Sequence, residues 1–207
     1  KKASKFIRRH GFTLGVQMMV GLPESTKIDE IKTAKELIKL KPKMVRIYPV
    51  LVIKNTKLAK DYENGIYTPL SLEQAVETSK ELLSLFNKKN VEVIRIGLQN
   101  TNTITDPSDE KSEVLAGPYH PAFRQLVEAS LWYDKIVSKI KKLDVKVKEV
   151  EITANPVDIN NIVGHHKQNT KNLKDFYNVT LKLKQNNSIR PNHFKLKVTK
   201  IYEDFKK

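Results

Sequence analysis

Three apolar segments of the sequence each end in residues whose side chains or backbone could bind a ligand. The endings are 21-GLPE-24, 46-RIYP-49 and 95-RIGLQ-99. In parallel α/β sheets, ligands bind at the carboxyl ends of the strands. Three such endings therefore indicate a site at one edge of a sheet. Gly21 would let a ligand approach the backbone, and Pro23 would fix the turn.

A second candidate site lies within 162-IVGHHKQNTKNLKDFYNVTLKL-183. The spacing, an Ile-Val-Gly turn, a helix, a turn and an alternating strand, is that of a KH RNA-binding domain. A KH loop of the form G-x-x-G clamps the nucleic-acid backbone, but this loop lacks the second Gly. The residues expected to contact RNA phosphates are Gly164, His165, His166, Lys167 and Lys171.

Two other readings of this segment stay open. A purely structural helix-turn-helix is as well supported by the pattern as RNA contact. A metal site is less favoured, because adjacent histidines point apart and no third ligand is near.

The elements that must position the first site alternate along the chain. The apolar pattern predicts strands at 16–20, 44–48 and 91–97, separated by helices at 28–40, 56–63 and 71–89. The last helix opens with 71-SLEQ-74, which has the form of a capping box. The order β-α-β-α-α-β over residues 14–98 is typical of a parallel sheet with right-handed crossovers.

Three regions follow from this pattern. Residues 1–100 hold the parallel α/β elements, and residues 101–143 hold a polar loop and a long connecting helix that starts near Pro121. Residues 144–207 open with the alternating sequence VKVKEVEIT, typical of a half-buried strand. We expect this last region to be a small α+β domain with KH-like features.

The composition limits the function classes. The chain has 207 residues, no cysteine and a net charge of +15. The absence of cysteine excludes disulfides, thiolate catalysis and thiolate-ligated clusters within these residues. Residues 135–207 carry 17 Lys and Arg against 7 Asp and Glu, which fits a polyanionic partner as well as a solvated surface. No apolar stretch is long enough to span a membrane and no signal peptide is visible, so cytoplasmic location is expected.

The first candidate site carries a resemblance to a known family. Residues 17-QMMVGLPE-24 look like the strand-five motif G-x-I-x-G-x-x-E of radical S-adenosylmethionine (radical SAM) enzymes, with Gln17 at the first Gly and Met19 at the Ile. Residues 46–58 are similar to the matching segment of the elongator catalytic subunit, and 116–128 to its bacterial relatives. Oxygen-independent coproporphyrinogen oxidases show the same shape more loosely. The resemblance covers roughly residues 11–100.

The resemblance implies a fold and a set of site residues. The fold would be the C-terminal half of a partial TIM-type (radical SAM) barrel, followed by the KH-like domain. The residues implied to bind the cofactor are Gln17, Met19, Gly21, Leu22, Pro23, Glu24, Arg46 and Tyr48. The residues implied to face the substrate are Arg95, Gln99, Tyr119, His120 and Arg124.

Each implied role has a structural alternative. Met18 and Met19 are more often core residues in an apolar strand. Arg46 and Arg95 could instead form buried salt bridges, and His120 could simply cap a helix.

The family binds its [4Fe–4S] cluster through C-x3-C-x2-C, which this sequence lacks. The resemblance therefore implies a parent enzyme that uses S-adenosylmethionine (SAM) and the cluster, and a chain that binds neither alone. We expect a part of an elongator-like enzyme that acts on tRNA, inactive by itself. The alternatives are a non-catalytic RNA-binding or scaffold module and a coproporphyrinogen oxidase-like oxidoreductase. The strand at 16–20 would have an open edge and could pair two copies of the chain.

Overall fold

A computed structural model describes residues 1–202, which form two compact units that divide between Val127 and Glu128. The first unit contains the helices α1 (Lys2–Arg9), α2 (Lys27–Lys39), α3 (Lys57–Glu63) and α4 (Leu72–Asn87). Its strands are β1 (Gly15–Val20), β2 (Met44–Pro49), β3 (Val52–Ile53), β4 (Glu92–Ile96) and β5 (Val114–Ala116). Helix α5 (Phe123–Ile140) continues into the second unit.

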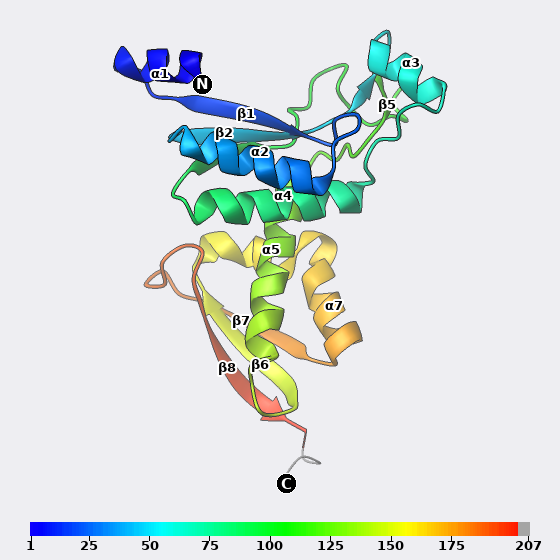
Figure 1. Cartoon of the computed structure of the whole chain (residues 1–207). Helices are drawn as coiled ribbons and strands as arrows, with labels where there is room; N and C mark the ends of the chain where they lie inside the picture. The colour runs from blue at the N-terminus through cyan, green and yellow to red at the C-terminus, as the bar shows by residue number, and fades with distance from the viewer. Residues whose placement is uncertain (203–207) are drawn as a thin grey trace. The chain divides into compact units, whose positions relative to one another are not determined.

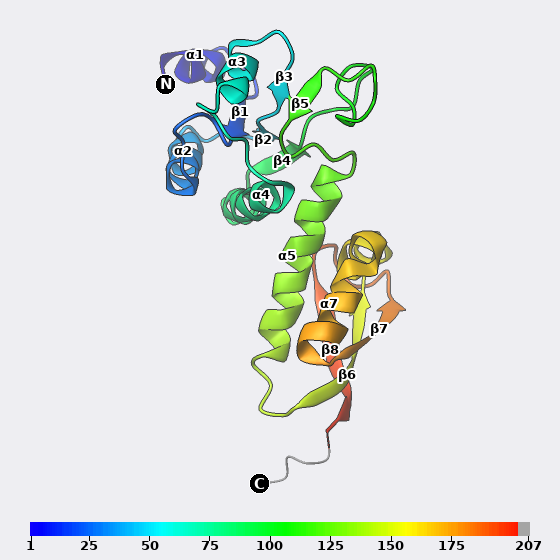
Figure 2. The same cartoon turned by 90° about the vertical axis from the view of Figure 1, so that its right-hand side faces the viewer.

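The main sheet of the first unit is parallel and has the strand order β1-β2-β4, as the alternating pattern predicts. Helices α2 and α4 lie along the same face of this sheet (Figures 1 and 2). Both helices begin with capping boxes, at Thr26 with Asp29 and at Ser71 with Gln74. These caps satisfy backbone N–H groups that a helix start otherwise leaves without partners.

The opposite face of this sheet is not covered by these helices. Along β1, Met18 and Val20 are buried toward the helices, whereas Gly15, Gln17 and Met19 are exposed. This alternation follows from the two-residue period of a strand. We call this surface the open parallel face; besides these β1 positions it carries residues 46, 48 and 95 of the neighbouring strands.

The segment after β2 leaves the sheet. Val52 and Ile53 form β3, which pairs with β5 in a separate antiparallel ladder. A small core of Val50, Val52, Ala59 and Tyr67 supports this ladder. The pairing brings residues 114–120 back to the carboxyl ends of the main strands.

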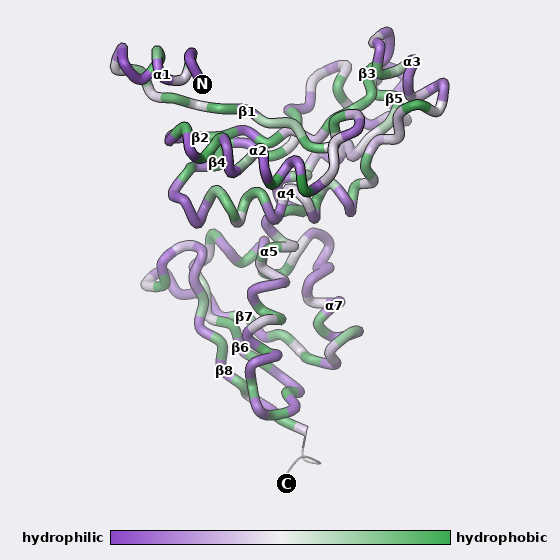
Figure 3. The backbone as a smooth tube through the Cα atoms, in the orientation of Figure 1, coloured by the Kyte–Doolittle hydropathy of each residue, from purple (hydrophilic) through white to green (hydrophobic). Residues whose placement is uncertain are grey.

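The second unit is a three-stranded sheet covered by helices on one face. Its strands are β6 (Val147–Ala154), β7 (Thr180–Gln185) and β8 (Phe194–Ile201), and its further helices are α6 (Ile159–Val163) and α7 (Gln168–Tyr177). The strand order is β7-β6-β8, with β6 parallel to β7 and antiparallel to β8. Hydrophobic and hydrophilic residues alternate along these strands (Figure 3). The core between sheet and helices includes Trp132, Ile136, Ile152, Ile162 and Leu173.

Candidate functional site

Three polar side chains form a row across the open parallel face. The strand register pairs Gln17 with Arg46 and Arg46 with Arg95. In-register residues of parallel strands lie on the same face, with strands about 4.8 Å apart. Gln17 and Arg46 are exposed, and Arg95 is half-buried. The row therefore places two guanidinium groups on neighbouring strands of one surface.

Neither arginine of this row is neutralised by an acid of residues 1–202. Within residues 1–202, no carboxylate forms an ion pair with Arg46 or Arg95, so the salt-bridge alternative has no partner here. Arg95 donates from Nη1 to Oε1 of Gln99 over 2.8 Å, which joins two of the predicted substrate residues. Guanidinium groups without a counter-charge favour an anion that accepts two hydrogen bonds at once, such as a carboxylate or a phosphate.

An apolar pair lies next to this row. Met19 is in register with Tyr48, and Met19 is 39% exposed whereas Met18 is only 4% exposed. Met18 is thus a core residue, and Met19 lies on the open parallel face beside the half-buried ring of Tyr48. The surface thus combines cations with a thioether and an aromatic ring.

In the turn after β1, both the backbone N–H and the backbone carbonyl of Gly21 form hydrogen bonds with side chains. Its N–H donates to the buried carboxylate of Glu30, and its carbonyl accepts from the hydroxyl of Tyr67 over 2.6 Å. Gly21 has φ +84°, and a Cβ there would lie 3.0 Å from the side chain of Leu70. Glycine is required because only it adopts this φ without strain and without that contact.

The groups that hold Gly21 have shifted pKa values. Burial raises the pKa of Glu30 above its ordinary value, although the hydrogen bond from Gly21 opposes the shift. Burial also raises the pKa of Tyr67, and the nearby Glu30 adds to this. Sequence reasoning missed both residues. An acidic residue at a core-facing helix position, one turn before the buried Ala34, was the available signal for Glu30.

Residues 21–25 form one wall of a pocket of about 220 Å3. The other wall comes from Asp61, Ile66, Tyr67, Thr68 and Leu70. The predicted residues Gly21, Leu22, Pro23 and Glu24 are thus together here. Gln17, Met19, Arg46 and Tyr48 do not line this pocket, so the predicted cofactor residues divide between the pocket and the open parallel face.

The predicted substrate residues beyond β4 lie at the ends of β2 and β4. Tyr119 and His120 line a void of about 10 Å3 together with Pro49, Gly97, Leu98 and their neighbours. Nδ1 of His120 accepts from the N–H of Ala122 over 3.0 Å, as the capping alternative predicts. Arg124 donates from Nη1 to the carbonyl of Val93 over 3.0 Å. Tyr119 and His120 are thus at the carboxyl ends of the strands, whereas Arg124 contacts the first part of β4.

The loop at 164–167 makes a sharp turn between α6 and α7. Gly164 has φ +80°, and His166 and Lys167 also have positive φ values of 48° and 62°. The buried amide of Asn169 donates to the carbonyls of Ala129, Asn161 and Ile162, and a Cβ on Gly164 would collide with it. His166, Lys167 and Lys171 are exposed, and the rings of His165 and His166 are in contact. Of the predicted RNA residues, His166, Lys167 and Lys171 thus present an exposed, cationic surface, whereas Gly164 is buried and His165 is half-buried.

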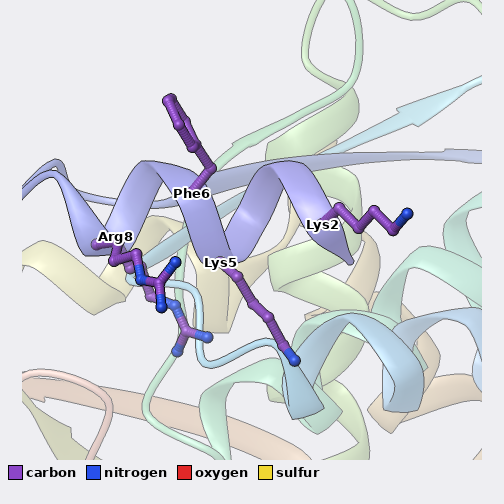
Figure 4. Close-up of a pocket in the computed structure, with 5 residues that line it drawn as sticks. Lys2, Lys5, Phe6 and Arg8 are labelled. Carbon is purple, nitrogen blue, oxygen red and sulfur yellow. The ribbon is translucent and has the colours of Figure 1, made fainter.

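The hollow beside α1 differs from the pocket at Gly21. An open hollow of about 610 Å3 runs along α1, lined by Lys2, Lys5, Phe6, Arg8 and Arg9. Its walls come from one helix only, and Phe6 leaves the helix away from Lys5 (Figure 4), so it encloses no ligand. Among residues 1–202, no three His, Asp or Glu side chains are grouped to hold a metal. The helices in the same range include none that could cross a membrane.

Part of the chain is similar to known proteins. Residues 42–133 match the Radical_SAM C-terminal domain. The tRNA uridine(34) acetyltransferases of Methanocaldococcus jannaschii and Methanocaldococcus infernus are 33% and 31% identical to the chain over 90 residues. These alignments cover 42% of the chain and 17% of each relative, so the chain matches about a sixth of their length.

One solved structure shares the fold. The archaeal Methanocaldococcus infernus Elp3, with its N-terminus deleted, superposes with a TM-score of 0.51 and 24% identity. The match covers 67% of this chain and 30% of that one. This structure shows a shared fold, whereas the family match and the relatives show that residues 42–133 are similar to the Radical_SAM C-terminal domain and that part of the chain is similar to elongator-like proteins, in line with the resemblance stated from the sequence.

Proposed function

We propose that this chain forms the C-terminal part of the barrel of an elongator-like radical SAM enzyme that modifies tRNA in the cytoplasm. The observation that carries the proposal is the row of Arg46 and Arg95, which lie on one surface without an acidic partner inside the matched domain. The relatives are named as tRNA enzymes, so we retain this reading over the coproporphyrinogen oxidase-like one.

The open parallel face supplies the roles that SAM requires. Arg46 and Gln17 would hold the charged amino-acid end of SAM, and Met19 and Tyr48 would pack on its apolar parts. SAM reduced by an iron–sulfur cluster supplies radical chemistry. These 207 residues contain no cysteine, so they do not fit the cluster, and its ligands would have to come from other residues. Arg95, Gln99 and the rim at Tyr119, His120 and Arg124 would face the tRNA.

The experiment uses the full-length protein that contains these residues. Its gene is read for C-x3-C-x2-C before this segment, and the product is reconstituted with iron and sulfide without oxygen. We expect SAM cleavage that falls at least tenfold in Arg46→Ala and is unchanged in Lys35→Ala, a lysine exposed on α2. No cluster motif, or stoichiometric iron bound by residues 1–207 alone, would overturn the proposal.

We also propose two partners. The KH-like turn at 164–167, with Lys171, would contact RNA weakly and with little sequence preference, because the second Gly of the loop is missing.

Strand β1 is at the edge of its sheet, so it could pair with another strand or with a second copy of the chain. Size-exclusion chromatography with light scattering tests the second idea, and a monomer at high concentration would refute the homodimer.

A further inference from the structure

A second sheet surface is strongly cationic and does not belong to the turn at 164–167. In the second unit, the register sets Glu151 between Lys182 and Lys197, and Thr153 between Lys184 and Lys195. The residues that alternate with these, such as Val150 and Ile152, are buried under the helices. Helices α5 and α7 lie on one side of this sheet (Figure 2), so the alternation along the strands puts the lysines on the other side. We call this surface the lysine face.

The acids on the lysine face neutralise only part of its charge. Glu149 accepts from Lys182 Nζ over 3.0 Å and from the hydroxyl of Thr199 over 2.8 Å. The hydrogen bond from Lys182, with a smaller one from Thr199, lowers the pKa of Glu149. Within residues 1–202, Lys184, Lys195 and Lys197 form no ion pair. Five lysines at 182, 184, 195, 197 and 200 thus face two glutamates.

The spacing of these lysines is regular. Residues two apart on a strand are separated by about 6.6 Å, and β7 and β8 lie about 10 Å apart on either side of β6. Two parallel lines of ammonium groups therefore border a polar strip of Glu151 and Thr153. The exposed large apolar side chains of the strands, Leu183 and Ile201, pair with Ile152 and Val147 on the other face. The lysine face offers repeated charges and no apolar anchor.

We infer that the lysine face binds the phosphate backbone of RNA. Repeated, flexible point charges without apolar anchors suit a polymer of phosphates, since contacts of this kind depend on charge and not on base edges. A membrane site would favour apolar residues that insert among lipids. The choice of RNA over other polyanions rests on the proposed function. The evidence that this surface is cationic comes from the strand register and the charges alone.

The test measures binding of an unmodified tRNA transcript to the full chain across a range of salt concentrations. Each phosphate contact contributes about 0.7–0.9 to the slope of log K against log salt. We expect Lys184→Gln with Lys195→Gln to weaken binding about tenfold and to lower the slope by about 1.4–1.8. Lys35→Gln with Lys39→Gln, a pair on α2 of the first unit, should change neither quantity.

Three outcomes would overturn the inference. These are no change in the Lys184 and Lys195 variant, an equal loss in the α2 pair, and equally tight binding of polyglutamate or of anionic phosphatidylserine vesicles. Unchanged thermal melting of each variant shows that the sheet is intact. The proposed role in SAM cleavage does not use Lys184 or Lys195. If the full-length protein does not cleave SAM, the proposed function is refuted, but the measurement of tRNA binding by the lysine face is unaffected.

Discussion

Each of the two three-stranded sheets in residues 1–202 leaves one face without covering helices, and the two faces differ in chemistry. The open parallel face combines two arginines with an amide, a thioether and a phenol, whereas the lysine face has five lysines, two glutamates and threonines. Guanidinium groups recognise one planar anion in a fixed geometry, and ammonium groups act as mobile point charges. The same architectural feature can thus serve a small ligand in one unit and a polymer in the other.

Exchange of the two kinds of cation gives the strongest test of this difference. Arg46→Lys keeps the charge but loses the planar fork, so we expect SAM cleavage by the full-length protein to fall about 10- to 100-fold. Lys184→Arg should leave tRNA affinity within about twofold, because a point charge is retained. Equal tolerance of both exchanges would show that the two faces recognise anions in the same way.

The turns beside the two faces are also held differently, by a carboxylate at Gly21 and by an amide at Gly164. Glu30→Ala removes the acceptor of the Gly21 N–H in a buried site, so we expect a loss of about 1–3 kcal/mol in the free energy of unfolding. Urea unfolding followed by circular dichroism measures the loss. Asp29→Ala, which removes only an exposed capping contact on the same helix, should cost less.

The carboxylate at Glu30 also makes stability depend on pH. Because burial raises its pKa in the folded state, its favourable contribution is complete below the unfolded value near 4.5 and is lost as pH rises through the folded value. Glu30→Gln keeps an acceptor without a charge. The variant should therefore match the natural protein near pH 4 and melt at a higher temperature near pH 7. A constant difference across this range would contradict the assignment.

The turn at 164–167 offers a smaller effect. Lys167 has φ +62°, a conformation that costs a residue other than glycine about 1 kcal/mol. Lys167→Gly gives the loop the G-x-x-G form and should raise the free energy of unfolding by a few tenths of a kcal/mol after the entropic cost of glycine.

Charge reversal in the same turn tests RNA binding. Lys167→Glu with Lys171→Glu should weaken tRNA binding more than Lys35→Glu with Lys39→Glu. Equal losses would indicate general electrostatics and a structural turn.

The sequence predicted β1, β2 and β4 and the helices α2, α3 and α4 of the first unit because each has a local signal, but it did not predict the short strands β3 and β5. The parallel order followed from alternating strands and helices, and the capping box at Ser71 was visible in four letters. The residues of the open parallel face came from strand endings and family resemblance. The sequence did not predict that these residues align in one row. A register shift between Val45 and Arg46 decides which residue of β4 lies opposite Arg46.

Long-range pairings account for what the sequence could not predict. The alternation of 147–154 indicated a half-buried strand, but only the strand order shows that β7 and β8 border it and gather their lysines on one face. In the same way, the role of Glu30 depends on a backbone N–H nine residues earlier, and that of Tyr67 on a carbonyl 46 residues earlier. Such contacts produce no periodic pattern in the sequence.

The double attachment of Gly21 has a consequence for the motions of the first unit. Its amide proton is held by a residue of α2, and its carbonyl is held by Tyr67 in the segment before α4. Exchange of that proton with solvent thus requires α2 to separate from the turn, and not merely a fluctuation of a surface loop. The Gly21 amide should exchange as slowly as those of the strand interior, and its rate would report how often the end of β1 opens.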